Sequence, residues 1–155
     1  MHKIRPTRAE DLNEIALLYR DTIQTVNRKD YTAEQVEAWS GRWNNIAGWA
    51  KRLNEQHFLL TEINGQISGF ASVTTAGYVD TLFVHKDHQG KGVARLLISA
   101  IKEFADQNDI DTLTTDASIT ARPVFERFGF SVLKGQTVAI GSVELNNFKM
   151  IKNLK

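Results

Sequence analysis

Residues 78–107 restrict the fold more than any other part of the chain, because a strand, a turn with two glycines and a helix follow one another directly. YVDTLFV reads as the strand and HKDHQGKG as the turn, and the apolar residues after Gly92 recur at helical spacing. The first N–H groups of a helix have no partner inside it and favour anions, and glycine lets the backbone approach a bulky anion. These residues therefore favour a phosphate site at the turn and the start of the helix, with Lys91 adding charge at its rim.

Other readings of this turn stay open from the residues alone. A glycine-containing turn between a strand and a helix is often no more than a turn. A dinucleotide-binding GxGxxG motif would need a third glycine where Arg95 stands. A P-loop needs Ser or Thr after Gly-Lys, whereas here Gly92 follows Lys91. The two nucleotide motifs therefore fit worse than a local phosphate site.

The overall charge limits the kind of anion that the chain can bind. The 155 residues include 19 basic and 18 acidic side chains, and a net charge of +1 gives no field that would hold a polyanion. We therefore expect no sequence-independent binding to nucleic acid. The chain has no cysteine, and its histidines at positions 2, 57, 85 and 88 lack the spacing of metal ligands, so we expect no metal site.

No segment predicts export or a membrane anchor. The first residues, MHKIRPTRAEDL, lack the apolar core of a signal peptide, and no run approaches about 18 consecutive apolar residues. With 42% hydrophobic residues, the chain is long enough for one core and short for two. We expect a single cytoplasmic domain over residues 1–155.

The first half of the chain is predominantly helical in its periodicity. It predicts a short strand in HKIRP, a helix opened by a capping box of Thr7 and Glu10, and a second helix opened by Thr32 and Gln35. NNIAGWAKRL predicts a further short helix. From His57 onward the spacing of the apolar residues changes from that of helices to that of strands.

The second half predicts a sheet with interspersed helices. An Asn-Gly turn at 64–65 joins HFLLTEI and QISGFASVTT into a hairpin, because these residues adopt the positive φ angles of a tight turn. After the strand TLTTDA, a helix from about 120 to 128 holds Pro123 in its first turn and ends at Gly129. The strands SVLKG and VELNNFKMI follow. The expected class is α+β, with one mixed α/β sheet.

The loop and the later helix carry a resemblance to a known family. QGKGVA resembles the Q/R-x-x-G-x-G/A signature of the GNAT superfamily of acyl-CoA-dependent N-acyltransferases, with Gln89, Gly92 and Ala94 at the signature positions. LFVHKDHQGKG resembles the fourth-strand segment before that signature, and ARPVFERFGF resembles the A-x-x-L-Y-E-K-x-G-F segment after it. The order of elements agrees over nearly the whole chain. DYTAEQVEAW, TTDASITARP and VELNNFKM further resemble a bacterial subgroup of YafP-like acetyltransferases.

The resemblance implies a mostly antiparallel sheet, flanked by helices, whose fourth and fifth strands splay apart around acetyl-CoA. The diphosphate would bind the amides of residues 90–95, and the pantetheine arm would run beside the fourth strand. Ser118 stands where many relatives have an asparagine that contacts this arm. The expected cofactor-binding residues are Leu82, Phe83, Val84, Gln89, Gly90, Lys91, Gly92, Val93, Ala94, Arg95, Ser118 and Phe125.

The implied reaction is attack of an amine on the thioester carbonyl. An amine with a pKa of about 10.4 is mostly protonated at neutral pH, so a base is needed. Asp80 stands roughly where several relatives keep a carboxylate base; pairing with a core hydroxyl or with Lys or Arg is the alternative, and Asp116 is a second candidate. Strand alternation would put Tyr78, Asp80, Leu82 and Val84 on one face. The amide of Leu82 is our choice for the oxyanion donor.

Phe125 departs from the family pattern, because many relatives have a tyrosine there that is taken to protonate the leaving thiolate. Tyr78, Ser118 or a water would replace it, or the thiolate would leave unassisted, since a thiol pKa of about 8.5 makes it a fair leaving group. We expect Asp80 and Tyr78 to be the catalytic residues.

Three functions stay open. The first is transfer of an acetyl group from acetyl-CoA to a primary amine of a small molecule or peptide by direct attack in a ternary complex. The second, which Phe125 favours, is a non-catalytic acyl-CoA-binding sensor, and the third is a nucleotide-phosphate-binding module of another family. Tyr31 and Trp39 are our candidates for acceptor contacts, with core packing as the alternative for the tryptophans. The acceptor and the pathway cannot be read from the sequence, and a homodimer is the common default.

Overall fold

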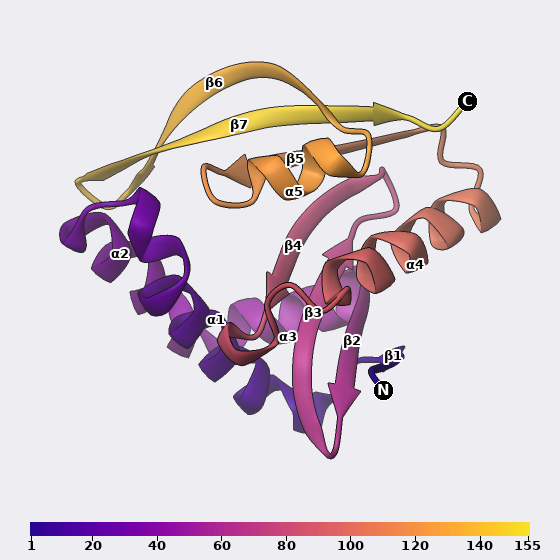
Figure 1. Cartoon of the computed structure of the whole chain (residues 1–155), viewed down its shortest axis with the longest axis horizontal. Helices are drawn as coiled ribbons and strands as arrows, with labels where there is room; N and C mark the ends of the chain where they lie inside the picture. Colours follow the sequence, from indigo (N-terminus) through magenta and orange to yellow (C-terminus); the bar gives the residue numbers. More distant parts are fainter.

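Seven strands join one sheet in the order β1-β2-β3-β4-β5-β7-β6, and the computed structural model describes all 155 residues (Figure 1). All neighbouring strands are antiparallel except β4 and β5, which are parallel, so the predicted α+β class with one mixed sheet is confirmed. The strands are β1 (Lys3–Pro6), β2 (His57–Ile63), β3 (Gln66–Val73), β4 (Tyr78–Val84), β5 (Thr112–Ser118), β6 (Ser131–Ile140) and β7 (Val143–Asn153). The helices are α1 (Leu12–Thr25), α2 (Ala33–Ser40), α3 (Ile46–Glu55), α4 (Val93–Gln107) and α5 (Arg122–Arg127).

The sheet separates two hydrophobic clusters, one on each face. Phe70 of β3 packs with residues of α1, α2 and α3, whereas the next residue, Ala71, packs with residues of α4 and α5. Successive residues of a strand point to opposite faces, so the two clusters lie on the two sides of the sheet. None of the helices combines the length and the apolar character that crossing a membrane requires.

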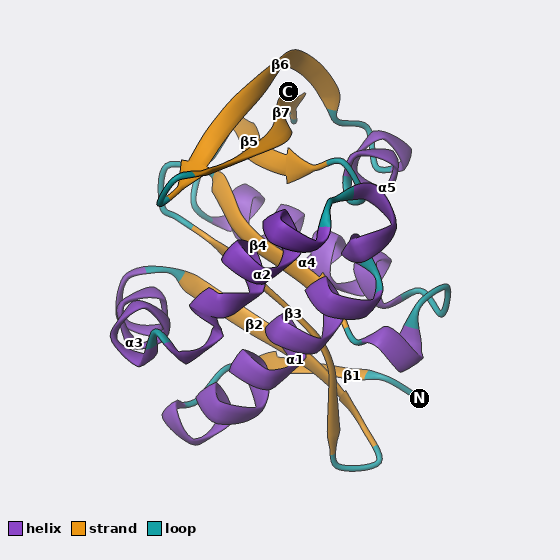
Figure 2. Cartoon of the chain, turned by 90° about the vertical axis from the view of Figure 1, so that its left-hand side faces the viewer, coloured by secondary structure: helices purple, strands orange, loops and turns teal.

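β4 and β5 are paired only where they begin. Tyr78 pairs with Thr114 and Val79 with Thr115, and no later residues of the two strands are paired. Figures 1 and 2 show the two strands diverging from this point, with β5 continuing into the layer that it forms with β7 and β6. The predicted splay of the fourth and fifth strands is confirmed. It leaves one edge of β4 without a strand partner.

Most of the predicted turns and caps are confirmed. Asn64 and Gly65 have φ angles of 51° and 77° and join β2 to β3. The side chain of Thr32 accepts a hydrogen bond from the amide of Gln35, and the Gln35 side chain accepts one from the amide of Thr32, so the second capping box is present. Gly129 follows α5 with a φ angle of 93°.

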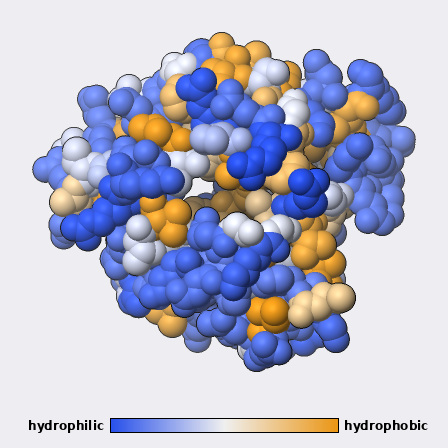
Figure 3. All heavy atoms as spheres, viewed as in Figure 1, coloured by the Kyte–Doolittle hydropathy of each residue, from blue (hydrophilic) through white to orange (hydrophobic).

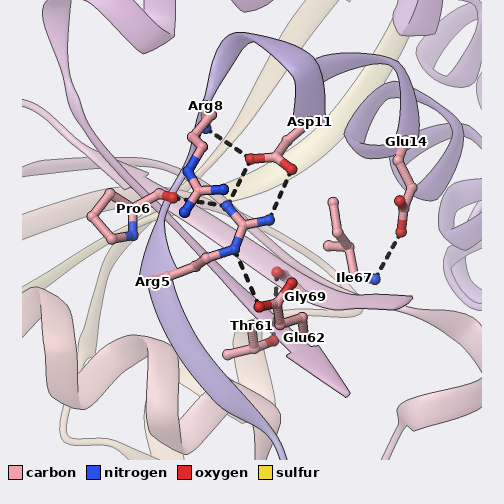
Figure 4. A network of polar contacts seen from close by, with 9 residues as sticks. All are labelled: Arg5, Pro6, Arg8, Asp11, Glu14, Thr61, Glu62, Ile67 and Gly69. Carbon is pink, nitrogen blue, oxygen red and sulfur yellow. Dashed lines mark hydrogen bonds and ion pairs between the residues drawn. The ribbon is translucent and has the colours of Figure 1, made fainter. Parts of the chain in front are cut away.

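The capping box predicted from Thr7 and Glu10 is wrong. The amide of Arg8 donates instead to Asp11, 2.8 Å away, and the guanidinium of Arg5 donates to both oxygens of the same carboxylate at 2.8 and 2.9 Å (Figure 4). The hydrogen bonds from Arg5 hold the pKa of Asp11 below its usual range. An ionised carboxylate already fixed by an arginine is a stronger acceptor than a threonine hydroxyl, which moves the start of the helix by one residue.

The predicted alternation along β4 is also wrong, because the strand contains a β-bulge. Ser72 pairs with Thr81 and Val73 with Val79, so Asp80 has no partner on β3. Val79 consequently lies in the α4 cluster, against which Leu82 and Val84 also pack. A bulge inserts one residue and shifts all later side chains by one face. The bulge directs the carboxylate of Asp80 toward α3.

Candidate active site

A cleft of about 630 Å³ occupies the space between the diverging strands. Its walls come from α1, α2 and the segment after it, α3, β4, the loop at 85–92, the start of α4, β5, α5 and the β6–β7 hairpin. Figure 3 shows the surface hollowed at this point, with hydrophobic residues inside the hollow. All predicted site residues except Lys91 line this cleft.

The glycine loop has the backbone geometry that an anion site needs. Gly90 and Gly92 have φ angles of 71° and 81°, in the left-handed region that favours glycine. The amide of Leu96 is the first that donates within the helix, to the carbonyl of Gly92 at 3.2 Å, and the amides of residues 90–95 donate to no protein acceptor. A Cβ added to either glycine would meet no atom within 4 Å. The loop is therefore an open cradle of free N–H groups that fits a diphosphate.

The side chain of Gln89 supports this loop from behind. Its amide group donates to the carbonyl of Val84 at 2.7 Å, and the hydroxyl of Thr22 donates to the same carbonyl at 3.2 Å. Gln89 thus ties the loop to the end of β4 and positions the free amides that follow it. Two arginines, Arg95 and Arg127, also line this end of the cleft; Arg127 was not predicted, because no local motif identifies it.

The unpaired edge of β4 exposes main-chain groups to the cleft. The amide of His85 donates to the carbonyl of Ser68, which makes these residues a hydrogen-bonded pair of the β3–β4 ladder. Hydrogen-bonded and non-hydrogen-bonded pairs alternate in an antiparallel ladder, so Phe83 also bonds to β3. Leu82 and Val84 therefore turn their N–H and C=O groups away from β3, toward the cleft. The carbonyl of Val84 is taken by Gln89 and Thr22, which leaves both groups of Leu82 and the N–H of Val84 for a ligand. This is the side on which an extended amide ligand can pair with the strand.

Asp80 lies on the floor of the cleft in an asymmetric environment. Its Oδ2 atom accepts from Nε of Arg52 at 2.8 Å and from Nε2 of Gln56 at 2.9 Å, whereas Oδ1 accepts no hydrogen bond from the protein. The side chain is 23% exposed. The ion pair considered as the alternative role is thus present, and one carboxylate oxygen still faces the cleft. Arg52 and Gln56 were not predicted, since they come from α3 and the residue after it.

Tyr78 and Asp116 form a second polar pair at the base of the splayed strands. The hydroxyl of Tyr78 donates to Oδ2 of Asp116 at 2.8 Å, and Oδ1 of Asp116 accepts from Gln136 and Lys149. Burial and the neighbouring carboxylate raise the pKa of Tyr78 well above its usual value, so its hydroxyl stays protonated. Asp116 has both oxygens occupied and is the poorer candidate for a base.

Ser118 and Phe125 lie on the β5–α5 side of the cleft. The hydroxyl oxygen of Ser118 accepts from the amide of Ala121 at 3.0 Å and so caps the turn before α5. The ring of Phe125 is 3% exposed and packs edge-on against Phe130, with the centroids 5.0 Å apart. Phe125 therefore supplies an apolar wall and no proton.

Tyr31 and Trp39 lie on the α2 side of the cleft, with their rings 5.4 Å apart. The Tyr31 hydroxyl donates to the carbonyl of Asn146 at 2.8 Å and accepts from the amide of Ile119 at 2.9 Å. It therefore bridges across the cleft, a role that the sequence did not indicate. Arg42 also lines this side and was missed, because it lies in an irregular segment without a motif.

Comparison with known families and proteins agrees with this geometry. The sequence model of the acetyltransferase (GNAT) domain matches residues 27–151. The chain is 30% identical over 148 residues to YafP, an uncharacterized N-acetyltransferase of Escherichia coli (strain K12), and the match covers 96% of this chain and 93% of YafP. These matches confirm the predicted resemblance, including the YafP-like subgroup.

Two solved structures show the same fold. A GCN5-related N-acetyltransferase from Rhodopseudomonas palustris has a TM-score of 0.94 and 34% identity, and the match covers 98% of this chain and 95% of that one. The PaiA N-acetyltransferase of Thermoplasma acidophilum, solved in complex with coenzyme A, has a TM-score of 0.78 at 16% identity, with 99% of both chains covered.

Proposed function

Because this chain belongs to the acetyltransferase (GNAT) family, we propose that it transfers an acetyl group from acetyl-CoA to a primary amine by direct attack in a ternary complex. The observation that carries the proposal is the cradle of free amides at residues 90–95, which opens into a cleft beside an unpaired strand edge. The anion site lies next to a strand edge with which an extended amide ligand can pair. This order of sites matches a diphosphate followed by a pantetheine arm. Bound acetyl-CoA would supply the activated thioester.

The cofactor-binding roles follow from the positions of the groups. We assign the diphosphate to the amides of 90–95, with Arg95 and Arg127 as flanking charges. The pantetheine amides would pair with the carbonyl of Leu82 and the N–H of Val84, between the apolar walls of Phe83 and Phe125. The Leu82 amide points into the cleft, which supports its proposed role as the donor to the oxyanion.

We assign proton removal to Asp80. Its Oδ1 atom is free to accept from an incoming ammonium group or from an intervening water, whereas Arg52 and Gln56 hold Oδ2 and fix the carboxylate. The deprotonated amine would then attack the thioester carbonyl. The C–S bond would break, the thiolate would leave, and the second proton of the amine nitrogen would pass to the thiolate or to solvent as the amide forms. The fixed orientation of Asp80 is what a positioned base requires.

Tyr78 can assist the leaving thiolate without giving up its proton. A thiol has a pKa of about 8.5, and the pKa of Tyr78 is raised far above that, so net transfer from the phenol is unfavourable. The hydroxyl can instead turn its hydrogen bond from Asp116 to the sulfur. In this account the leaving group is stabilised by a hydrogen bond, which is why Phe125 need not be a tyrosine.

The test is to incubate the protein with acetyl-CoA and a diverse panel of primary amines while the free CoA thiol is measured. We expect amine-dependent thiol release above a matched blank. Tight CoA binding with no release for any amine would overturn the transferase proposal and favour the acyl-CoA sensor. Preference for ATP or NAD over CoA in a thermal-shift screen would point to a nucleotide-binding module. The cytoplasmic location, the single-domain organisation and the homodimeric state of this protein stay predictions.

A further inference from the structure

The acceptor side of the cleft is bridged by residues 30–35, which we call the strap. Besides Tyr31, which bonds to Asn146 and Ile119, the carboxylate of Asp30 accepts from the Thr120 hydroxyl at 2.8 Å. The amide group of Gln35 donates to the Glu144 carbonyl at 2.8 Å. The strap thereby joins the α1–α2 region to the β5–α5 turn and the β6–β7 hairpin. These hydrogen bonds close the gap between the splayed strands on this side of the cleft, which favours a small acceptor over a long peptide.

The charges that line the cleft do not balance on the acceptor side. The carboxylate of Asp80 is paired with Arg52, and that of Asp116 with Lys149, which lies outside the cleft lining. Arg42 lines the cleft but lies within ion-pair distance of no carboxylate. An unpaired guanidinium beside an apolar wall is a ready partner for a ligand carboxylate, which it can bind with two parallel hydrogen bonds.

Arg42 and Asp80 line the same cleft, and the segments that carry them are in contact. The ring of Trp39, three residues before Arg42, lies 6.4 Å from the ring of Phe83, three residues after Asp80 in β4. Tyr19 joins the same two residues, because its hydroxyl donates to the carbonyl of Trp39 at 3.0 Å and its ring lies 5.1 Å from that of Phe83. The unpaired arginine and the free oxygen of Asp80 therefore belong to the same part of the cleft.

We infer that the acceptor is a small amino acid, whose carboxylate is bound by Arg42 and whose amine is bound at Asp80. The chain between the two groups would lie against the rings of Trp39 and Phe83, which are 6.4 Å apart. A single guanidinium matches a monoanionic carboxylate. The strap closes one side of the cleft and so limits the size of the acceptor. This inference rests on the proposed acetyl transfer and specifies its acceptor.

The test uses matched sets of acceptors with the full-length protein and acetyl-CoA. Each set consists of an amino acid, its primary amide and the amine without the carboxyl group, with separations of amine and carboxylate from α to ω. We expect kcat/KM to be about 10-fold to 100-fold higher for the best amino acid than for its amide or amine, the range typical of a hydrogen bond to a charged group. Arg42→Gln should remove this preference, mainly through KM, and leave the amides and amines within about twofold of their former rates.

Two controls separate binding from damage to the protein. Arg28 is exposed and does not line the cleft, so Arg28→Gln should keep the preference, and Arg42→Lys should keep part of it. A thermal-shift assay with saturating CoA and the N-acetylated amino acid gives a readout without turnover; the added shift should vanish in Arg42→Gln.

Equal kcat/KM for an amino acid and its amide, or an equal loss for all acceptors in Arg42→Gln, would overturn this inference alone. No thiol release with any amine would overturn the proposed function and this inference with it.

Discussion

At the cofactor end of the cleft, the groups available to a ligand are mainly main-chain amides of six consecutive residues, 90–95. At the acceptor end they are side chains, among them Arg42, Arg52 and Asp80, which come from the segment after α2, from α3 and from the bulge in β4. A main-chain site depends on local conformation, whereas a side-chain site depends on how distant segments pack. The first kind tolerates many sequences, and in the proposed transferase the second would determine the acceptor.

The largest expected effect tests the main-chain site. Gly92→Val should weaken acetyl-CoA binding about 100-fold or more, as if two hydrogen bonds to a charged group were lost, because valine disfavours the left-handed conformation and projects into the cradle. Gly65→Val is the matched control, since Gly65 has a similar φ angle of 77° and equal free space but lies in the β2–β3 turn. Calorimetric titration should show weak binding in the first variant alone. Unchanged affinity in Gly92→Val would remove the loop from the mechanism.

The next effect tests the side-chain site. Asp80→Asn should lower kcat about 100-fold at pH 7, the usual contribution of a general base, and less at pH 9, where more of the amine is already neutral. Asp111→Asn, at an exposed carboxylate paired with Lys155, should have no effect. Initial rates of thiol release across this pH range provide the measurement. A loss of the same size at both pH values, or no loss, would exclude Asp80 as the base.

A smaller effect is expected at the strap. Tyr31→Phe removes one donor and one acceptor and leaves the Ile119 amide and the Asn146 carbonyl without their partner, so the free energy of unfolding should fall by about 1–3 kcal/mol. With the strap loosened, the rates with bulky amines should rise relative to those with small amines, while acetyl-CoA affinity stays unchanged. Chemical denaturation and rates with amines of graded size measure both. A variant with wild-type stability and wild-type size preference would show that the strap does not limit the acceptor.

The smallest effect concerns stability and lies outside both ends of the cleft. Burial lowers the pKa of His57, whose ring stacks on Phe104 with centroids 4.1 Å apart. The unfolded chain then binds a proton more readily than the folded protein, so stability falls as the pH drops below about 6.5 toward the lowered pKa. His57→Phe should flatten this part of the pH–stability curve without changing acetyl-CoA affinity. An unchanged slope between pH 7 and 5 would contradict the assignment.

The same contrast explains what the sequence could and could not predict. The strand, the turn and the helix of residues 78–107 were predicted with nearly their observed bounds, because glycine conformation and helical period are local properties. The bulge at Asp80 was missed, since it is defined by pairing with β3 and has no signature within β4. The face assigned to Asp80 was wrong for the same reason. One extra residue reverses every later side chain.

The acceptor end could be predicted only in part. Tyr31 and Trp39 were identified from the family resemblance, and both line the cleft. The bonds of Tyr31 to Ile119 and Asn146 join residues that are 88 and 115 positions apart, which no local pattern contains. The charge of Arg42 is visible in the sequence, but its lack of a partner emerges only from the packed structure.

The most direct test of the central claim is a titration of the isotope-labelled protein with CoA, followed by the backbone amide resonances. If the diphosphate is held by main-chain N–H groups, the largest shifts should occur at residues 90–95, with smaller ones at Leu82 and Val84. Binding of CoA with unshifted resonances at 90–95 would contradict the account.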